Sequence, residues 1–202
     1  MPSMTHATDV PASTAPPAPN RPPEWLDLPN GFALRRRTVA DAPEINDAVI
    51  RNLEHLRPWM PWASAAPSLA HSTEMTRVGS ELWEQGSDFL YVLVAAERPE
   101  RIVGMFGLHR RIGPDGIEIG YWIDQEHTGR SLATNGSAAL TGAALNLADV
   151  ERVEIHCDEA NAASAAVPRK LGYRLDRIVE VPGEAPAETG RKLIWIQQRP
   201  AG

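Results

Sequence analysis

The order of strand-like and helix-like segments is the feature that most constrains how this chain can fold. Alternating or continuous apolar runs predict strands at residues 31–38, 88–96, 101–111, 117–124, 152–158, 173–181 and 191–198. Apolar residues at helical spacing predict helices at 38–56, 68–87, 131–148 and 161–171. Short turns at 97–100 and 113–116 join the middle strands, which are therefore antiparallel. This order predicts the α/β class, with a mixed, largely antiparallel seven-stranded sheet flanked by about four helices.

Composition divides the 202 residues into a short arm and one domain. The first 24 residues contain seven of the 18 prolines. Such a segment buries too little apolar surface to offset the entropy lost on ordering it. We therefore predict a disordered proline-rich arm at 1–24 and a single domain at 25–202.

Charge and cysteine content exclude several classes of protein. The net charge of −6 argues against nucleic acid as a main partner, and the single cysteine, Cys157, excludes an intrachain disulfide framework. No run approaches the roughly 20 apolar residues that a membrane span requires. The six histidines lack the His-x-x-x-His spacing typical of metal sites. We therefore expect a cytoplasmic protein that binds no metal, no membrane and no nucleic acid.

The stretch WIDQEHTGRSLATNG, residues 122–136, joins a predicted strand to a predicted helix. The strand ends at Asp124 and the helix begins near Ser131, with Gly129 and Arg130 between them. The first turn of a helix has unpaired backbone N–H groups, and its dipole favours an anion there. A pyrophosphate cradle is one interpretation of this junction, and an ordinary turn is the other.

The stretch NAASAAVPRKLGYRL, residues 161–175, predicts the last helix and the start of a strand. Asn161 is a good N-cap, and Gly172 suits a helix end. Pro168 lies about seven residues into this helix, where it removes a backbone N–H and crowds the preceding turn. Most helices would not tolerate a proline at that place.

Three of these segments, taken in order, carry a family resemblance. EIGYWI (118–123), HTGRSLAT (127–134) and NAASAAVPRKLGY (161–173) resemble the Gcn5-related N-acetyltransferase (GNAT) superfamily. HLRPWMPWA (55–63) is similar to a phrase of its RimJ/RimL-type branch, which acetylates the N-termini of ribosomal proteins and other amines. The resemblance covers residues 31–198. It implies the acyl-CoA N-acyltransferase fold, with the pantetheine of acetyl-CoA between the strands at 117–124 and 152–158.

The resemblance also implies a set of site residues. Those expected to bind the cofactor are Tyr121, Trp122, Ile123, His127, Thr128, Gly129, Arg130, Ser131, Ala133, Thr134 and Asn161. Two positions depart from the superfamily pattern. Ser131 stands where a second glycine is common, and Pro168 stands where many members have a tyrosine that protonates the leaving thiolate. We expect Ser164 to replace that tyrosine as the acid, or else to contact the cofactor.

The acceptor side has its own candidates. An amine must lose a proton before it attacks a thioester, and the branch pattern places an acidic residue at Glu118 as the base. An outward-facing charge is the alternative for Glu118, and Glu54 and His55 are the next candidates for the base. Trp59 and Trp62 lie close together in the loop after the first helix, where we expect them to line the acceptor pocket. Core packing is the alternative for Tyr121 and Trp122.

These features predict an acetyl-CoA-dependent N-acetyltransferase that acts on a primary amine, most simply a protein or peptide α-amine, by direct attack in a ternary complex. The alternatives are a small-amine or antibiotic N-acetyltransferase, an enzyme with a longer donor such as succinyl-CoA, and a non-catalytic CoA-binding module. The expected partner is the amine acceptor, and a homodimer is a second expectation.

Overall fold

The computed structural model describes residues 20–200. Its strands are β1 (Trp25–Leu28), β2 (Phe32–Arg36), β3 (Asp88–Ala95), β4 (Arg98–His109), β5 (Gly116–Ile123), β6 (Arg152–Asp158), β7 (Arg174–Glu180) and β8 (Arg191–Gln198). Its α-helices are α1 (Ala42–Arg51), α2 (Leu53–Leu56), α3 (Leu69–Gln85), α4 (Leu132–Leu145) and α5 (Ala162–Lys170). Short 3₁₀ turns are η1 (Pro29–Gly31), η2 (Val39–Asp41), η3 (Pro61–Ala63) and η4 (Gln125–His127).

The strands form one mixed sheet in the order β1-β2-β3-β4-β5-β6-β8-β7. Every neighbouring pair is antiparallel except β5 with β6, which the connection through α4 makes parallel. The predicted fold class is confirmed, and the strand count differs by one. The additional strand is β1, whose four residues directly follow the proline-rich segment and pair with β2. A run this short shows too little alternation to predict a strand.

The helix predicted at 38–56 is divided in the structure. It begins with η2, where the carboxylate of Asp41 accepts a 2.7 Å hydrogen bond from the backbone N–H of Thr38. It then breaks at Asn52, whose φ of −106° and ψ of 9° are not helical. The buried side chain of Asn52 bonds to neighbours outside the helix, and this explains the break.

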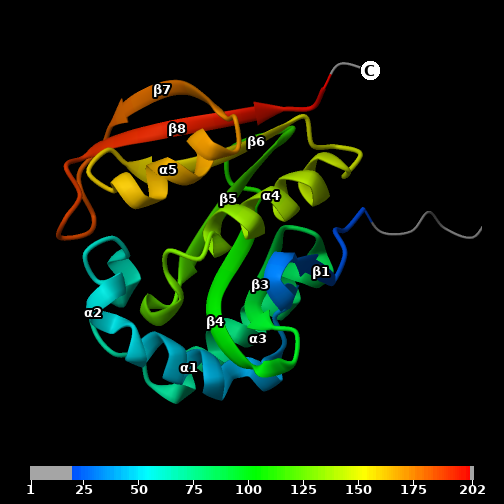
Figure 1. Cartoon of the computed structure of the whole chain (residues 1–202), viewed down its shortest axis with the longest axis vertical. Coiled ribbons are helices and arrows are strands. Elements are labelled where there is room, and N and C mark those ends of the chain that lie inside the picture. The colour runs from blue at the N-terminus through cyan, green and yellow to red at the C-terminus, as the bar shows by residue number, and fades with distance from the viewer. Residues whose placement is uncertain (1–19, 201–202) are drawn as a thin grey trace, which may run out of the picture.

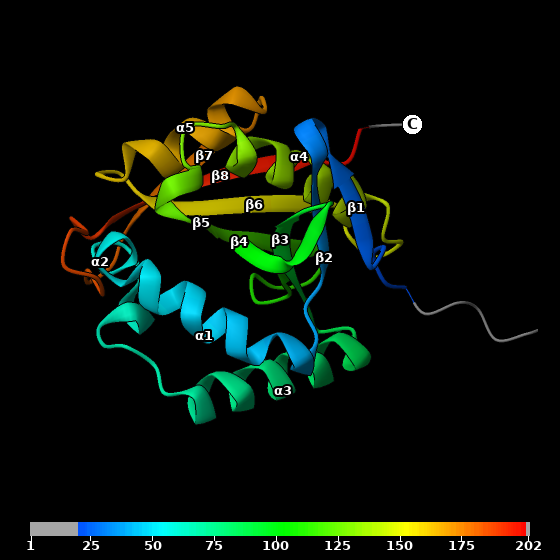
Figure 2. The same ribbon diagram turned by 60° about the horizontal axis from the view of Figure 1, so that its bottom comes forward.

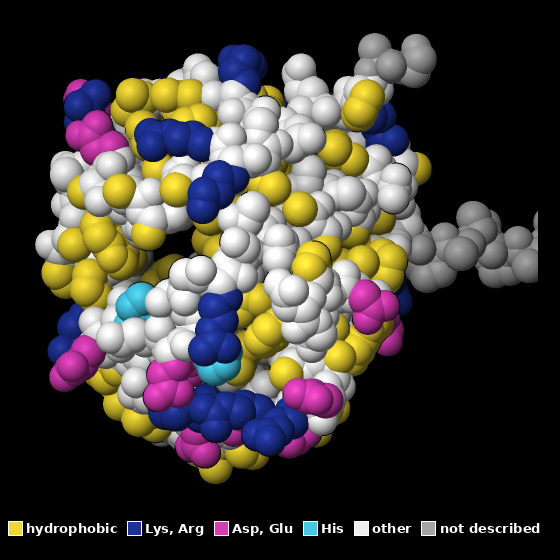
Figure 3. Space-filling view, in the orientation of Figure 1, with side chains coloured by type: hydrophobic (Ala, Val, Ile, Leu, Met, Phe, Trp, Pro, Cys, Tyr) yellow, Lys and Arg dark blue, Asp and Glu magenta, His cyan; other side chains and the backbone are white. Residues whose placement is uncertain are grey.

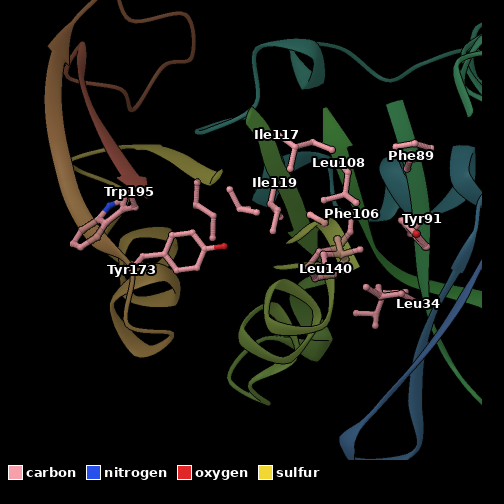
Figure 4. Close-up of a cluster of buried hydrophobic side chains, with 14 of the residues drawn as sticks. Leu34, Phe89, Tyr91, Phe106, Leu108, Ile117, Ile119, Leu140, Tyr173 and Trp195 are labelled. Atoms are coloured by element: carbon pink, nitrogen blue, oxygen red, sulfur yellow. The ribbon is translucent and has the colours of Figure 1, made fainter. Parts of the chain in front are cut away.

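Helices cover both faces of the sheet. Figure 2 shows α1 and α3 on one side and α4 and α5 on the other. Alternate residues of β5 face these two layers, as the pleat of a strand requires. Ile117 and Ile119 belong to a core cluster with Leu140 of α4, part of which Figure 4 shows. Trp122 belongs instead to a cluster with Val49 of α1.

Residues 20–24, which the sequence analysis assigned to the arm, lie against the domain. The phenol of Tyr91 donates a 2.8 Å hydrogen bond to the carbonyl of Pro23, and Arg21 forms a 2.9 Å ion pair with Glu84. The rest of the predicted arm, residues 1–19, lies outside the described residues. Within the described part of the chain, no helix has the length and apolar character needed to cross a membrane.

Candidate active site

The parallel strands β5 and β6 separate along their length. They pair only where Gly116, Ile117 and Glu118 lie opposite Arg152, Val153 and Glu154. Beyond Glu118, β5 pairs with β4 alone, while β6 continues beside β8 as far as Asp158. Figure 1 shows the two strands diverging, and in the same orientation Figure 3 shows the surface hollowed between α5 and the segment around α2. The divergence leaves backbone groups on facing strand edges without strand partners, and an extended ligand can bind such groups.

Tyr121 reaches from β5 to α5. Its phenol lies 3.1 Å from the hydroxyl of Ser164 and donates to the carbonyl of the same residue at 3.2 Å. Burial raises the pKa of Tyr121, so the phenol keeps its proton at neutral pH. The backbone N–H of Ser164 donates to the side chain of Asn161 at 3.0 Å, which confirms the predicted N-cap. Two hydroxyl groups therefore meet near the separated strands.

Cys157 lies close to this hydroxyl pair but belongs to the core. The thiol is buried in the cluster that also contains Trp195. Burial raises the pKa of Cys157, so it is protonated at neutral pH. This environment is that of a small core residue and not of a nucleophile.

On the opposite face of the sheet, polar residues form a row across four neighbouring strands. Asp88 of β3 lies opposite His109 of β4, which lies opposite Glu118 of β5, which lies opposite Glu154 of β6. The row crosses the sheet where the pairing of β5 and β6 ends. We call these four residues the polar row.

Arg111 holds the carboxylate of Glu118 at two points. Its Nε and Nη2 donate to the two Glu118 oxygens at 2.8 and 2.7 Å. Burial alone would raise the pKa of Glu118, but Arg111 and the nearby His156 outweigh it and hold the pKa below its usual value. Glu118 is therefore charged at neutral pH and is a weaker proton acceptor than an ordinary glutamate.

The loop between β5 and α4 is exposed and has an unusual backbone. Gly129 has φ +73° and Ser131 has φ +60°, so both residues adopt the left-handed conformation. Thr128, Gly129, Arg130 and Ser131 are all exposed, and α4 begins directly after them. Ala133 and Thr134 are half-buried in its first turn. The N-terminal turn of α4 therefore opens to solvent, as an anion-binding helix end requires.

Comparison with known proteins decides the family. The model of the acetyltransferase (GNAT) domain family matches residues 32–174, which is well over half of the chain. This chain belongs to the GNAT acetyltransferase family.

A curated relative resembles this chain in sequence, and solved structures share its fold. YdaF of Bacillus subtilis (strain 168), whose name provisionally assigns it as a ribosomal N-acetyltransferase, is 28% identical over 144 residues, which cover 70% of this chain and 77% of YdaF. RimL, a ribosomal L7/L12 α-N-protein acetyltransferase solved with coenzyme A, superposes with a TM-score of 0.79 at 19% identity, covering 87% of this chain and 98% of RimL. MccE, a microcin C7 self-immunity acetyltransferase solved with acetyl-CoA and AMP, has a TM-score of 0.78 at 15% identity, covering 87% and 97%.

An anchored aspartate holds the exposed loop of the GNAT domain in place. The Asp124 carboxylate is buried and accepts from the side chain of Asn52 at 3.0 Å and from the backbone N–H of Glu126 at 2.9 Å. His127 is half-buried, with Nδ1 3.6 Å from the same carboxylate. Because Asn52 lies between α1 and α2, this link couples the loop to the segment that carries the predicted acceptor residues.

The predicted acceptor residues lie in and after α2. Glu54 is exposed, His55 and Trp59 are half-buried, and the side chain of Trp62 is exposed. The backbone N–H of Ala187 donates to the carbonyl of Pro58 at 3.0 Å, which brings the loop after β7 against this segment. The role of these four side chains stays a prediction.

Of the polar row, only Glu118 was predicted from the sequence. His109, Asp88 and Glu154 were not, because these residues meet only through the strand register. One signal was available. The turn at 113–116 joins two predicted strands as a hairpin, and pairing them from that turn brings residues near 109 opposite residues near 118.

Proposed function

We propose that this GNAT enzyme transfers the acetyl group of acetyl-CoA to the α-amine of a protein or peptide. The observation that carries the proposal is the separation of β5 from β6 beside the exposed loop 127–134. A thioester bound in that gap is open to an amine approaching from the face that carries the polar row. Direct attack in a ternary complex then needs no enzyme nucleophile, in agreement with the buried, protonated Cys157.

The exposed loop is the proposed site for the pyrophosphate of acetyl-CoA. The backbone N–H groups of Gly129 and Ser131 together with the side chain of Arg130 would bind the phosphates, and a Cβ at Gly129 would meet nothing within 4 Å. Thr128, whose own N–H donates to the carbonyl of Gln125, would line the same site. His127, Ala133 and Thr134 flank this loop. The edge of β5 at Tyr121, Trp122 and Ile123 would bind the pantetheine amides, with Asn161 on the opposite side.

Ser164 is the proposed acid for the leaving thiolate. Its hydroxyl is 3.1 Å from the Tyr121 phenol, which holds it beside the separated strands. A proton that Ser164 gives to sulfur can be replaced by the second proton of the substrate amine. The CoA thiol is a fair leaving group with an ordinary thiol pKa of about 8.5. The acid should therefore contribute about 10²-fold to the rate, the low end of the range for general acid catalysis.

The acceptor is proposed to bind near α2, with Trp59 and Trp62 as apolar walls and Glu54 and His55 at the mouth. Carboxylates in and near the polar row would attract a cationic amine. The ribosomal-protein activities that the names of YdaF and RimL give to those proteins favour a peptide α-amine as the acceptor here.

A thiol-release assay with acetyl-CoA tests the proposed function. The acceptors are an unstructured peptide with a free α-amine, the same peptide with a blocked α-amine, spermidine and an aminoglycoside. We expect thiol release with the free peptide and a mass increase of one acetyl group at its N-terminus. Release with only spermidine or the aminoglycoside would contradict the peptide acceptor, and release with none of them would contradict transfer to these amines.

Acetyl-CoA binding is tested separately by calorimetric titration. Gly129→Glu should weaken binding by about 2–4 kcal/mol, because a carboxylate repels the phosphates and blocks the backbone. Gly142→Glu is the matched control. Gly142 is exposed in the body of α4, so this substitution introduces the same charge away from the loop. Equal affinity in the two folded variants would contradict the phosphate site.

A further inference from the structure

His109 of the polar row has the geometry of a histidine held in one orientation. Its Nδ1 lies 2.8 Å from the Asp88 carboxylate, across the β3–β4 register. A carboxylate at that nitrogen favours the tautomer with the proton on Nδ1 and leaves a lone pair on Nε2. The side chain of His109 is 18% exposed, so this nitrogen lies in a partly open environment.

Two glycines on neighbouring strands make room for the imidazole. A Cβ at Gly107 of β4 would overlap Nε2 of His109, and a Cβ at Gly120 of β5 would lie 3.4 Å from it. Gly120 is the second residue after the last β5–β6 pair, so Nε2 lies beside the point where the two strands separate. Within residues 20–200, Nε2 of His109 makes no hydrogen bond.

From this arrangement we propose that His109 is the general base of the acetyl transfer and that Asp88 is its positioning residue. The proposal rests on the proposed function only in placing the thioester between β5 and β6. It names a proton acceptor for whichever amine this site binds.

The neighbouring candidates are already engaged. Both oxygens of Glu118 accept from Arg111. His156 has Nε2 2.6 Å from Glu154 and Nδ1 3.6 Å from Glu118, so both of its nitrogens face carboxylates. The Nδ1 of His156 makes no hydrogen bond either, but it faces the Glu118 carboxylate. The Nε2 of His109, among the described residues, makes neither a hydrogen bond nor an ion pair.

The proposed step balances protons and electrons. Nε2 takes a proton from the substrate ammonium, and the freed lone pair forms a C–N bond to the thioester carbonyl carbon. Collapse of the tetrahedral intermediate breaks the C–S bond, and the sulfur leaves with its electron pair. The second amine proton passes to the sulfur through Ser164 or water. His109 returns its proton to solvent, so the products are the amide, the free thiol and one proton.

Kinetics on the intact enzyme test the role of His109. We expect His109→Gln to lower kcat/KM for the amine at pH 7 by about 10²–10⁴-fold, while KM for acetyl-CoA stays within about twofold because His109 does not contact the proposed cofactor loop. The deficit should shrink as the pH approaches the pKa of the amine, where solvent supplies free base. His71→Gln, a change at an exposed histidine of α3, is the matched control and should leave the rate unchanged.

Two further variants separate His109 from its neighbours. Asp88→Asn should lower kcat while changing KM for the amine by a smaller factor. Glu118→Gln should lower kcat/KM by a smaller factor than His109→Gln does. The charged groups beside His109 are Asp88 and Glu118, and Arg111 and His156 contact Glu118 in turn. If Glu118→Gln gives the larger deficit and that deficit shrinks at high pH, Glu118 is the base and the proposal is wrong.

A measurement without any acceptor keeps the test independent of the proposed function. Long-range ¹⁵N–¹H NMR of ¹⁵N-histidine-labelled enzyme reports which ring nitrogen carries the proton, and His109→Gln assigns the signal. We expect neutral His109 to be protonated on Nδ1, with this preference lost in Asp88→Asn. A proton on Nε2 in the wild-type enzyme would overturn the proposal, even if the peptide is acetylated. If spermidine is the only acceptor, the peptide assignment fails and the same kinetics are run with spermidine.

Discussion

Replacing Asn52 by leucine should weaken the connection between the acceptor segment and the proposed cofactor loop. Asn52 is 2% exposed and makes three hydrogen bonds with its side chain. Its amide donates to the carbonyl of Ala48 at 2.8 Å and to the Asp124 carboxylate at 3.0 Å, and its oxygen accepts from the backbone N–H of Gln125 at 2.8 Å. Leucine has a similar size but can make none of these bonds.

The expected loss of stability follows from the partners that remain. The variant leaves a buried carboxylate oxygen and a backbone N–H without their partner, and each such group costs about 1–3 kcal/mol. Burying the leucine side chain offsets part of this, by about 1.5–3 kcal/mol at most. With mid-range values, a cost of about 4 kcal/mol for the two groups, less about 2 kcal/mol for the leucine, lowers the free energy of unfolding by about 2 kcal/mol. For a chain of this size, that corresponds to a decrease in Tm of about 4–8 °C.

Urea unfolding followed by tryptophan fluorescence and circular dichroism measures this change. Asn146→Leu is the matched control, because Asn146 is exposed at the end of α4 and its side chain makes no hydrogen bond within residues 20–200. We expect the control to stay within about 0.5 kcal/mol of the wild type. If Asn52→Leu is equally neutral, the hydrogen bonds to Asp124 and Gln125 do not anchor the loop, and the argument fails.

Two other predictions concern backbone strain and acid stability. Ser131→Gly should raise the free energy of unfolding by up to about 1 kcal/mol. The reason is that a φ of +60° costs a non-glycine residue about 1–2 kcal/mol. An unchanged or lower Tm would show that Ser131 is not strained. Burial alone would raise the pKa of Asp158, but hydrogen bonds from Ala160, Thr189 and Gly190 hold it below its usual value. Asp158 should therefore stabilise the fold fully above its unfolded-state pKa of about 3.9, and this stability should be lost as the pH falls through the folded-state pKa. Urea titrations between pH 7 and 3 should show the difference between the wild type and Asp158→Asn shrinking at low pH, and a constant difference would refute it.

The main outline of the fold was predictable because it depends on local sequence patterns. Hairpin-length turns fixed the antiparallel middle strands, and the long connection through α4 allowed a parallel pair. The N-cap at Asn161 was also predictable, since it needs only neighbouring backbone groups. β1 and the break at Asn52 were not, because β1 depends on pairing with β2 and the break on a bond to Asp124, 72 residues away in sequence.

The candidate site was predictable only where a motif marks a backbone conformation. The loop at Gly129 and Ser131 belongs to this class. The environment of Glu118 does not, because its charge state depends on Arg111 beyond the end of β4 and on His156 from β6. The orientation of His109 depends on Asp88, which is contributed by the preceding strand of the sheet. Side chains from three or four strands determine this chemistry, and no single segment of sequence contains it.

Pro168 shows how a residue that conflicts with a local pattern can fit the site. In a regular helix the N–H of residue 168 would donate to the carbonyl of Ser164, and proline has no such N–H. The structure shows what that carbonyl does instead, since it accepts the phenol of Tyr121 from β5 at 3.2 Å. Many members of the superfamily have a tyrosine on this helix at the place of Pro168. In this chain the proline leaves the carbonyl of Ser164 free to accept from Tyr121 of β5. The phenol therefore lies beside the Ser164 hydroxyl, at the place where the proposed reaction must deliver a proton to sulfur.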